Sequence, residues 1–95
     1  MRGRETVLLV EDDPGVRDVT RLILNKYRYT VLDATDGATA LQVSRGHPGS
    51  IEIVVSDVVM PEMSGRQLAD ILLLERPRCR ELFMSEVREL LDRPD

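Results

Sequence analysis

The sequence predicts an α/β domain built on a doubly wound parallel sheet with helices on both faces. Four short segments rich in apolar or β-branched residues are typical of strands, and segments with apolar residues at helical spacing follow them. Two of the strand-like segments end abruptly in acidic residues. Strands that alternate with helices favour parallel pairing through right-handed crossovers.

The first half of the chain is interpreted as strand, helix, strand, helix. Thr6–Val10 is a nearly continuous apolar run, typical of a strand that is buried on both faces. Asp13-Pro14 places a capping carboxylate before a proline in the first helical position, so a helix is expected over about 14–26. Tyr29–Leu32 supplies the aromatic and β-branched residues of a second strand. Asp36-Gly37 opens a second helix.

The second half of the chain repeats this order. Ile51–Ser56 is the third expected strand, and Gly65–Glu75, which Pro77 stops, is the third helix. Arg80–Ser85 contains the apolar residues of a fourth strand, and Glu86–Arg93 carries apolar residues at helical spacing. The expected sheet therefore has four strands.

Length and charge limit the possible functions. The 95 residues can hold one modest core, so residues 1–95 are interpreted as a single domain. The 13 Lys and Arg residues against 17 Asp and Glu residues, with Lys26 as the only lysine, argue against nucleic-acid binding. No apolar stretch approaches a membrane span, and the single cysteine, Cys79, fits a reducing compartment. We therefore expect a cytoplasmic protein that binds neither nucleic acid nor a membrane.

Three acidic side chains follow the first and third expected strands. Glu11 and Asp12 come directly after the first strand, and Asp57 comes after the third. Ligands bind at the carboxyl ends of such strands, and the strand order 2-1-3-4 would bring these carboxylates together. Converging carboxylates repel unless one is protonated or a cation lies between them, and an all-oxygen set suits Mg²⁺. The alternative is that acidic residues simply begin loops. The charged residues within 17–21, on the first expected helix, are interpreted as a solvated helix face.

Several segments carry the pattern of a known family. They are Leu8–Pro14, Asp36-Gly37, Ser56–Gly65 and Leu82–Ser85. In this combination the sequence resembles the receiver domains of two-component response regulators. The resemblance implies a flavodoxin-like sheet in the order 2-1-3-4 and a signalling domain that is not an enzyme. It also implies a phosphorelay, in which a histidine kinase or histidine phosphotransfer protein is the partner.

The same resemblance implies roles for five residues. Asp57 would be the phosphoacceptor, a carboxylate nucleophile that forms an acyl phosphate, and a metal ligand as well. Asp12 would bind Mg²⁺ directly, Glu11 would help through water or a hydrogen bond, and the backbone carbonyl of Val59 would complete the metal shell. Ser85 would donate a hydrogen bond to a phosphoryl oxygen. Mg²⁺ would be needed because phosphoryl transfer to a carboxylate concentrates negative charge.

The sequence departs from the family pattern after Ser85. The family continues with a helix, a fifth strand that ends in a Lys-Pro pair and a last helix, whereas residues 86–95 contain no lysine. We therefore expect a receiver-like domain that is incomplete at its C-terminal side, through either an internal deletion or a truncation. A sheet that ends at the fourth strand leaves that edge open, which favours a homo-oligomer formed through it.

Three functional hypotheses follow. The first is a phosphoacceptor that takes a phosphoryl group onto Asp57 with Mg²⁺. The second is a pseudo-receiver, a protein-interaction module without stable phosphorylation, which the missing lysine favours. The third is a Mg²⁺-dependent phosphatase with an aspartyl nucleophile. Such enzymes usually carry a second aspartate two residues after the nucleophile, where this chain has Val59, so the third hypothesis ranks last.

Overall fold

The computed structural model describes residues 5–86 and contains a four-stranded parallel sheet. The strands pair in the order β2-β1-β3-β4, so the predicted fold class and strand order are confirmed. This order places β1 and β3 side by side at the centre of the sheet. The strands are β1 Thr6–Val10, β2 Thr30–Ala34, β3 Ile53–Ser56 and β4 Arg80–Phe83. The helices are α1 Pro14–Lys26, α2 Gly37–Gly46 and α3 Gly65–Glu75.

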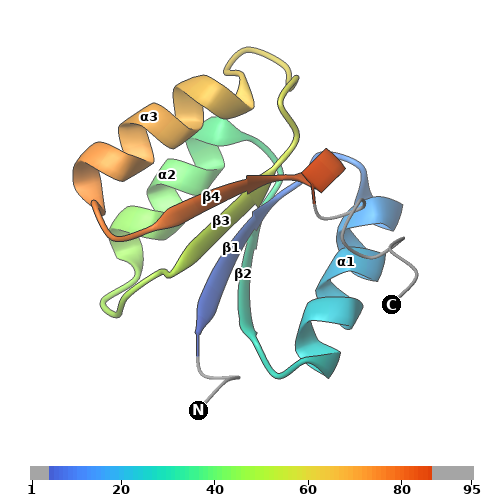
Figure 1. The fold of residues 1–95 in the computed structure, drawn as a ribbon. Coiled ribbons are helices and arrows are strands. Elements are labelled where there is room, and N and C mark those ends of the chain that lie inside the picture. Colours follow the sequence, from blue (N-terminus) through green and yellow to red (C-terminus); the bar gives the residue numbers. More distant parts are fainter. Residues whose placement is uncertain (1–4, 87–95) are drawn as a thin grey trace.

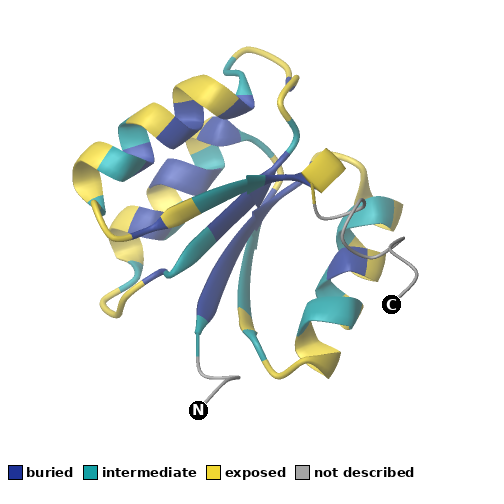
Figure 2. Ribbon diagram, viewed as in Figure 1, coloured by how far each residue is buried: buried dark blue, intermediate teal, exposed yellow. Residues whose placement is uncertain are grey.

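The helices form a layer on each side of the sheet (Figure 1). The pair α2 and α3 lies on one face of the sheet, and α1 lies on the other. Figure 2 shows that the central strands and the inward sides of α2 and α3 are buried. Thr20 is the only buried residue of α1. Within residues 5–86, the sheet is therefore covered more completely on the side of α2 and α3.

Alternate residues of β1 contribute to two hydrophobic cores. Leu8 and Val10 belong to the core that α2 and α3 cover, whereas Val7 and Leu9 belong to the core on the α1 side. All residues of β1 are buried because helices cover both faces of the sheet at this strand. This burial explains why the strand appears in the sequence as a nearly continuous apolar run.

The helix boundaries predicted for α1 and α3 are confirmed. Asp13 is the N-cap of α1, which runs over the predicted 14–26. Ser64 caps α3 in a reciprocal capping box with Gln67, and α3 spans the predicted 65–75. Short polar side chains therefore fix the beginning of both helices beside the carboxyl ends of β1 and β3.

Two strands begin later than the sequence predicted. β2 begins at Thr30 and ends at Ala34, because its pairing with β1 continues past Leu32. β3 begins at Ile53 and not at Ile51. These shifts leave the carboxyl ends of β1 and β3 where the sequence placed them.

Helical structure begins directly after β4. The strand ends at Phe83 and does not reach the predicted Ser85, and Met84–Glu86 are helical. The Phe83 amide donates a hydrogen bond to Glu86 Oε1 over 2.9 Å. This bond satisfies one of the amides that a helix start leaves free. The rest of the predicted helix Glu86–Arg93 lies outside the described residues.

β4 forms one edge of the sheet. Among the described strands it pairs only with β3. Arg80 is exposed on this strand, and one carboxylate oxygen of Glu81 is buried without a hydrogen-bond partner. Charged side chains on an edge strand oppose pairing with a second chain. Self-association through this edge stays a prediction.

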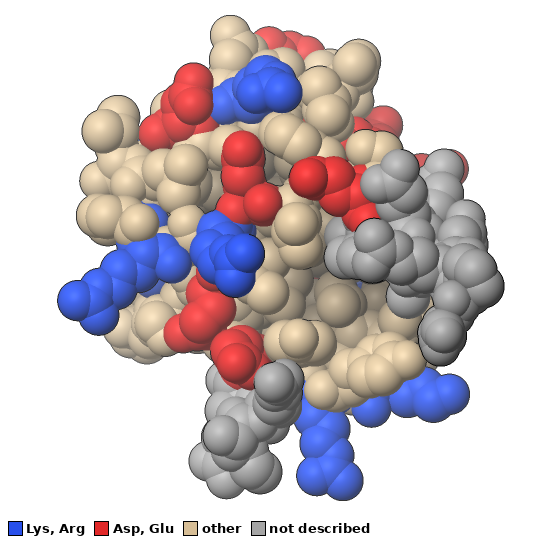
Figure 3. All heavy atoms as spheres, viewed as in Figure 1, with Lys and Arg blue, Asp and Glu red and all other residues tan. Residues whose placement is uncertain are grey.

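Charged side chains of both signs share the surface. On the face drawn in Figure 3, the Lys and Arg side chains of the described residues are interspersed with Asp and Glu side chains. The visible face is therefore a surface of mixed charge.

No helix within residues 5–86 is both long enough and apolar enough to cross a membrane.

Arg76, at the end of α3, ties this helix to the end of α2. Its guanidinium donates hydrogen bonds to the hydroxyl oxygen of Ser44 and to the carbonyl oxygens of Ser44, His47 and Gly49, over 2.7 to 2.9 Å. These carbonyls lie where α2 ends, so they lack the full set of helical partners. A side chain from a neighbouring helix thus caps α2.

Replacing Arg76 with methionine is expected to lower the free energy of unfolding by about 2 to 3 kcal/mol, because the two oxygens of buried Ser44 and the half-buried His47 carbonyl lose a charged donor. Urea unfolding followed by circular dichroism measures this change. Arg78→Met is the matched control, because Arg78 is exposed and lies in the same connection, and it should cost less than about 0.5 kcal/mol. Equal costs for the two variants would refute a capping role for Arg76.

Candidate functional site

The carboxyl ends of two neighbouring strands bring three acidic residues together. Val10 pairs with Ser56 at the ends of β1 and β3, so the next residues of both strands leave the sheet at the same edge. One carboxylate oxygen from each of Glu11, Asp12 and Asp57 lies within 4.8 Å of the others. The structure therefore brings together the three carboxylates that the sequence predicted to converge.

Glu11 is the buried member of this cluster. Glu11 is only 3% exposed. Its amide donates a hydrogen bond to the Ala34 carbonyl over 3.0 Å, and its Oε2 accepts one from the Asp13 amide over 3.1 Å. Burial raises the pKa of Glu11 from 4.5 to about 6, against the opposing effect of the Asp13 amide. The charge of Asp57 and the side-chain contacts with Asp57 and Asp12 raise this pKa further. Glu11 therefore keeps its proton to a higher pH than an exposed glutamate does.

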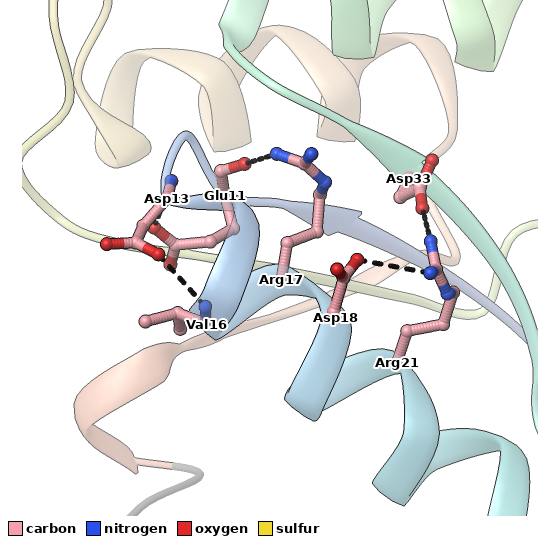
Figure 4. Close-up of polar contacts among 7 residues, drawn as sticks. All are labelled: Glu11, Asp13, Val16, Arg17, Asp18, Arg21 and Asp33. Carbon is pink, nitrogen blue, oxygen red and sulfur yellow. Dashed lines mark hydrogen bonds and ion pairs between the residues drawn. The ribbon is translucent and has the colours of Figure 1, made fainter.

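Three hydrogen bonds fix the turn between β1 and α1 (Figure 4). The first joins the Asp13 amide to the carboxylate of Glu11, as described above. In the second, Asp13 Oδ1 accepts from the Val16 amide over 3.0 Å. In the third, Arg17 Nη1 donates to the carbonyl oxygen of Glu11 over 2.8 Å. The turn that carries Glu11 and Asp12 is thus tied to the beginning of α1.

The charged residues within 17–21 have defined partners, so the predicted solvated helix face is only part of the description. Arg21 forms ion pairs with Asp18 on α1, over 3.1 Å, and with Asp33 on β2, over 2.5 Å. Arg17 contacts the end of β1. The pair of Arg21 with Asp18 follows from helical spacing, whereas sequence spacing did not indicate the contacts with Asp33 and Glu11, because only the fold brings α1 beside these strands.

The loop after Asp57 folds back closely against that residue. The Gly65 amide donates to the Val58 carbonyl over 2.8 Å. A Cβ atom at Gly65 would lie 2.1 Å from the carbonyl oxygen of Asp57, so glycine is needed for the close approach. Within the loop Glu62 has a φ of 70°, in the left-handed region. The start of α3 therefore fixes the backbone on which Asp57 stands.

Val59 and Ser85, the other two predicted site residues, follow the carboxyl ends of β3 and β4. Val59 lies in the loop after Asp57 and is 85% exposed. Ser85 is exposed in the helical segment that follows β4. The last residue of β4, Phe83, pairs with Ser56 at the end of β3. Both residues therefore lie toward the same end of the sheet as the carboxylates, and their roles stay predictions.

The donors of the cluster suit a hard divalent cation. All three side chains offer carboxylate oxygens, and these can approach one another closely enough to share an ion. Mg²⁺ takes oxygen ligands, commonly one or two carboxylates, and keeps several waters. Asp12 is exposed and Asp57 is half-buried, so solvent reaches the cluster. The residues present therefore fit Mg²⁺.

The stability of the metal-free chain is expected to fall as the pH rises from 4.5 to 7. Below pH 4.5 Glu11 is protonated in both states, whereas above pH 6 the folded chain must hold a buried carboxylate that ionises more easily when unfolded. A pKa raised to about 6 corresponds to a loss of about 2 kcal/mol. Urea unfolding in a chelator measures this loss, which Glu11→Gln should abolish. Parallel pH profiles for the two chains would contradict the raised pKa.

The fold and the site together define a doubly wound α/β domain with an acidic cluster at the carboxyl edge of its sheet. The family model of the response regulator receiver domain matches residues 7–93, and the chain belongs to this family. The resemblance inferred from the sequence motifs is therefore confirmed. Receiver domains are signalling domains of two-component systems.

Curated relatives agree with this assignment. The chain is 42% identical over 89 residues to the sensor kinase CckA of Brucella abortus (strain 2308), a match that covers 94% of this chain and 9% of that protein. It is 33% identical over 76 residues to a two-component response regulator-like protein of Arabidopsis thaliana, covering 80% of this chain and 13% of that protein. The chain thus spans a small part of the relatives that it matches.

Solved structures share the fold. A two-component transcriptional regulator AraC from Clostridium phytofermentans ISDg matches with a TM-score of 0.75 and 30% identity, over 84% of this chain and 65% of that one. The response regulator TrrA of Thermotoga maritima, solved with Mg²⁺ and BeF, matches with a TM-score of 0.75 and 24% identity, over 84% of this chain and 68% of that one. At this identity the second match supports the fold alone.

Proposed function

We propose that the chain accepts a phosphoryl group on Asp57 within a two-component phosphorelay. The observation that carries this proposal is the gathering of Glu11, Asp12 and Asp57 within 4.8 Å at the carboxyl edge of the sheet. Two of these carboxylates can hold a cation beside a third that can act as a nucleophile. A histidine kinase or a histidine phosphotransfer protein would supply the phosphoryl group.

Transfer would begin with attack of an Asp57 carboxylate oxygen on the phosphorus atom of a phosphohistidine. An O–P bond forms at Asp57, the P–N bond breaks, and the released imidazole takes up a proton. Asp57 is half-buried, so a partner can reach its carboxylate from solvent. The hydroxyl of Ser85 would donate a hydrogen bond to a phosphoryl oxygen of the product.

The site residues would also hold the cation that such a transfer needs. Mg²⁺ would neutralise the negative charge that the phosphoryl group brings to the carboxylates. Asp12 supplies an exposed carboxylate, Glu11 a buried one, and we assign the backbone carbonyl of Val59 as a further ligand. Because Glu11 must lose its proton to contribute a negative charge, cation binding should weaken as the pH falls below about 6.

The missing lysine bears on the rate of transfer. Lys26, in α1, is the only lysine of this sequence. A fixed positive charge beside the phosphoryl oxygens stabilises the transition state, so transfer should be slower in this chain than in one that carries such a lysine. A pseudo-receiver, which signals through protein contacts without stable phosphorylation, is the alternative that the following experiment distinguishes.

Intact mass spectrometry after incubation with a small-molecule phosphodonor and Mg²⁺ tests the proposal. The native chain is expected to gain one phosphoryl group, whereas Asp57→Asn gains none because an amide is a poor nucleophile. Asp70→Asn, on an exposed position of α3, is the matched control and should be phosphorylated like the native chain. A chelator should abolish the gain in both.

Circular dichroism of the same samples establishes that each variant is folded. A folded native chain that gains no phosphoryl group contradicts the phosphoacceptor proposal and favours a pseudo-receiver. Equal gain by Asp57→Asn places the modification on another residue and contradicts the proposed role of Asp57.

A further inference from the structure

We infer that Arg17 is a positioning residue for the turn that carries two of the three site carboxylates. This inference rests on the proposed function of the site. A guanidinium offers hydrogen-bond donors and no ligand atom, so Arg17 cannot itself bind a cation. Its role is to hold the peptide between Glu11 and Asp12 in the orientation that aims both side chains at the site.

The contact that carries the inference joins Arg17 Nη1 to the carbonyl oxygen of Glu11 over 2.8 Å (Figure 4). This carbonyl belongs to the planar peptide bond between Glu11 and Asp12, so its orientation affects the direction of both side chains. A hydrogen bond from a charged donor is shorter and stronger than one between neutral groups. Arg17 is half-buried, so water screens the contact only in part.

The turn needs such a contact because regular pairing ends at Glu11. The Glu11 amide still donates to the Ala34 carbonyl over 3.0 Å, but the following residues leave the sheet. Asp13 Oδ1 accepts a hydrogen bond from the Val16 amide of α1, and the Asp13 amide donates one to the Glu11 carboxylate. Arg17 adds the bond that reaches the Glu11 main chain directly from α1. The end of β1 and the start of α1 therefore form one unit.

Two possible roles of Arg17 predict opposite changes in cation affinity. If Arg17 acted only through its positive charge, its removal would strengthen Mg²⁺ binding, because a like charge near the ion would be lost. If Arg17 positions the turn, its removal weakens binding, because the carboxylates lose their alignment. Partners that orient metal ligands are worth roughly 10- to 100-fold in affinity.

Isothermal titration calorimetry with Mg²⁺ distinguishes these roles in the native chain, Arg17→Met, Arg17→Lys and Arg21→Met. Methionine keeps the apolar stem and removes the donors, whereas lysine keeps the charge and a donor. Arg21→Met is the matched control, because Arg21 is a cation on the same helix that contacts Asp18 and Asp33. We expect binding about tenfold weaker in Arg17→Met, recovery of most of that loss in Arg17→Lys, and a change below about twofold in Arg21→Met.

Amide hydrogen exchange in the chelated chain gives a second readout that needs no metal. Arg17→Met should speed exchange of the Asp13 amide, which donates to Glu11, whereas Arg21→Met should leave its rate unchanged. Circular dichroism melting shows whether each variant is folded.

Equal or tighter Mg²⁺ binding by folded Arg17→Met overturns the inference, and so does an equal loss of affinity in Arg21→Met. A native chain that binds no Mg²⁺ overturns the metal site of the proposed function together with the inference. Normal binding by the native chain beside unchanged binding by Arg17→Met overturns the inference alone.

Discussion

Gly65→Ala is expected to destabilise the folded chain by about 3 to 5 kcal/mol. The added methyl carbon would lie 2.1 Å from the carbonyl oxygen of Asp57 and 3.0 Å from a ring carbon of Phe83. The first of these neighbours is a main-chain atom, so it cannot rotate aside as a flexible side chain can. Relief requires that α3 move away from the end of β3, which would also displace the backbone of Asp57. Urea unfolding followed by circular dichroism measures the loss.

Gly46→Ala is the matched control for this prediction. Gly46 ends α2, and a Cβ atom there would meet no heavy atom within 4 Å. The same chemical change should therefore leave stability unchanged or raise it by up to about 1 kcal/mol, because alanine favours helix more than glycine does. Similar stabilities for the two variants would contradict this prediction, because they would mean that α3 lies farther from the Asp57 carbonyl than in the structure.

Asp12→Asn is expected to weaken Mg²⁺ binding by at least about tenfold, which is the lower end of the effect for residues that merely orient a ligand. Asp12 is the exposed carboxylate of the cluster, so the substitution should change the free energy of unfolding by less than about 0.5 kcal/mol. Calorimetric titration with Mg²⁺ measures the affinity.

Asp13→Asn is the control for this second prediction, because it removes the same charge one position along the chain. Asn caps helices as well as Asp does, so the hydrogen bond from the Val16 amide should persist. Its effect on Mg²⁺ binding should stay below about threefold, the size of a screened interaction over a longer distance. An equal loss in both variants would show that net charge near the turn, and not ligation by Asp12, governs the affinity.

Much of the fold could be predicted from the sequence because its signals are local. The apolar run of β1, the Asp13 cap of α1 and the proline that stops α3 act on neighbouring residues, and the elements that they define have the predicted bounds. The ends of β2 and β4 could not be predicted equally well, because pairing with β1 extends β2 to Ala34 and the helical turn after Phe83 shortens β4.

The carboxylates of the site could also be predicted, because each directly follows a buried strand and the strand order determines which ends meet. The contacts behind them could not. Arg17 reaches Glu11, Arg21 reaches Asp33, and Arg76 reaches the end of α2, and each of these bonds joins elements that only the folded chain brings together. Long cationic side chains of this kind give no periodic signal in a sequence, so they resemble any solvated helix face.

Reduction of the phosphodonor-treated chain with borohydride shows directly whether Asp57 carries the phosphoryl group. Borohydride converts an acyl phosphate into an alcohol, so the modified residue is identified by its mass within a peptide. We expect homoserine in place of Asp57, formed only when Mg²⁺ was present during phosphorylation. Reduction at a different carboxylate, or at none in a folded chain, would contradict this expectation.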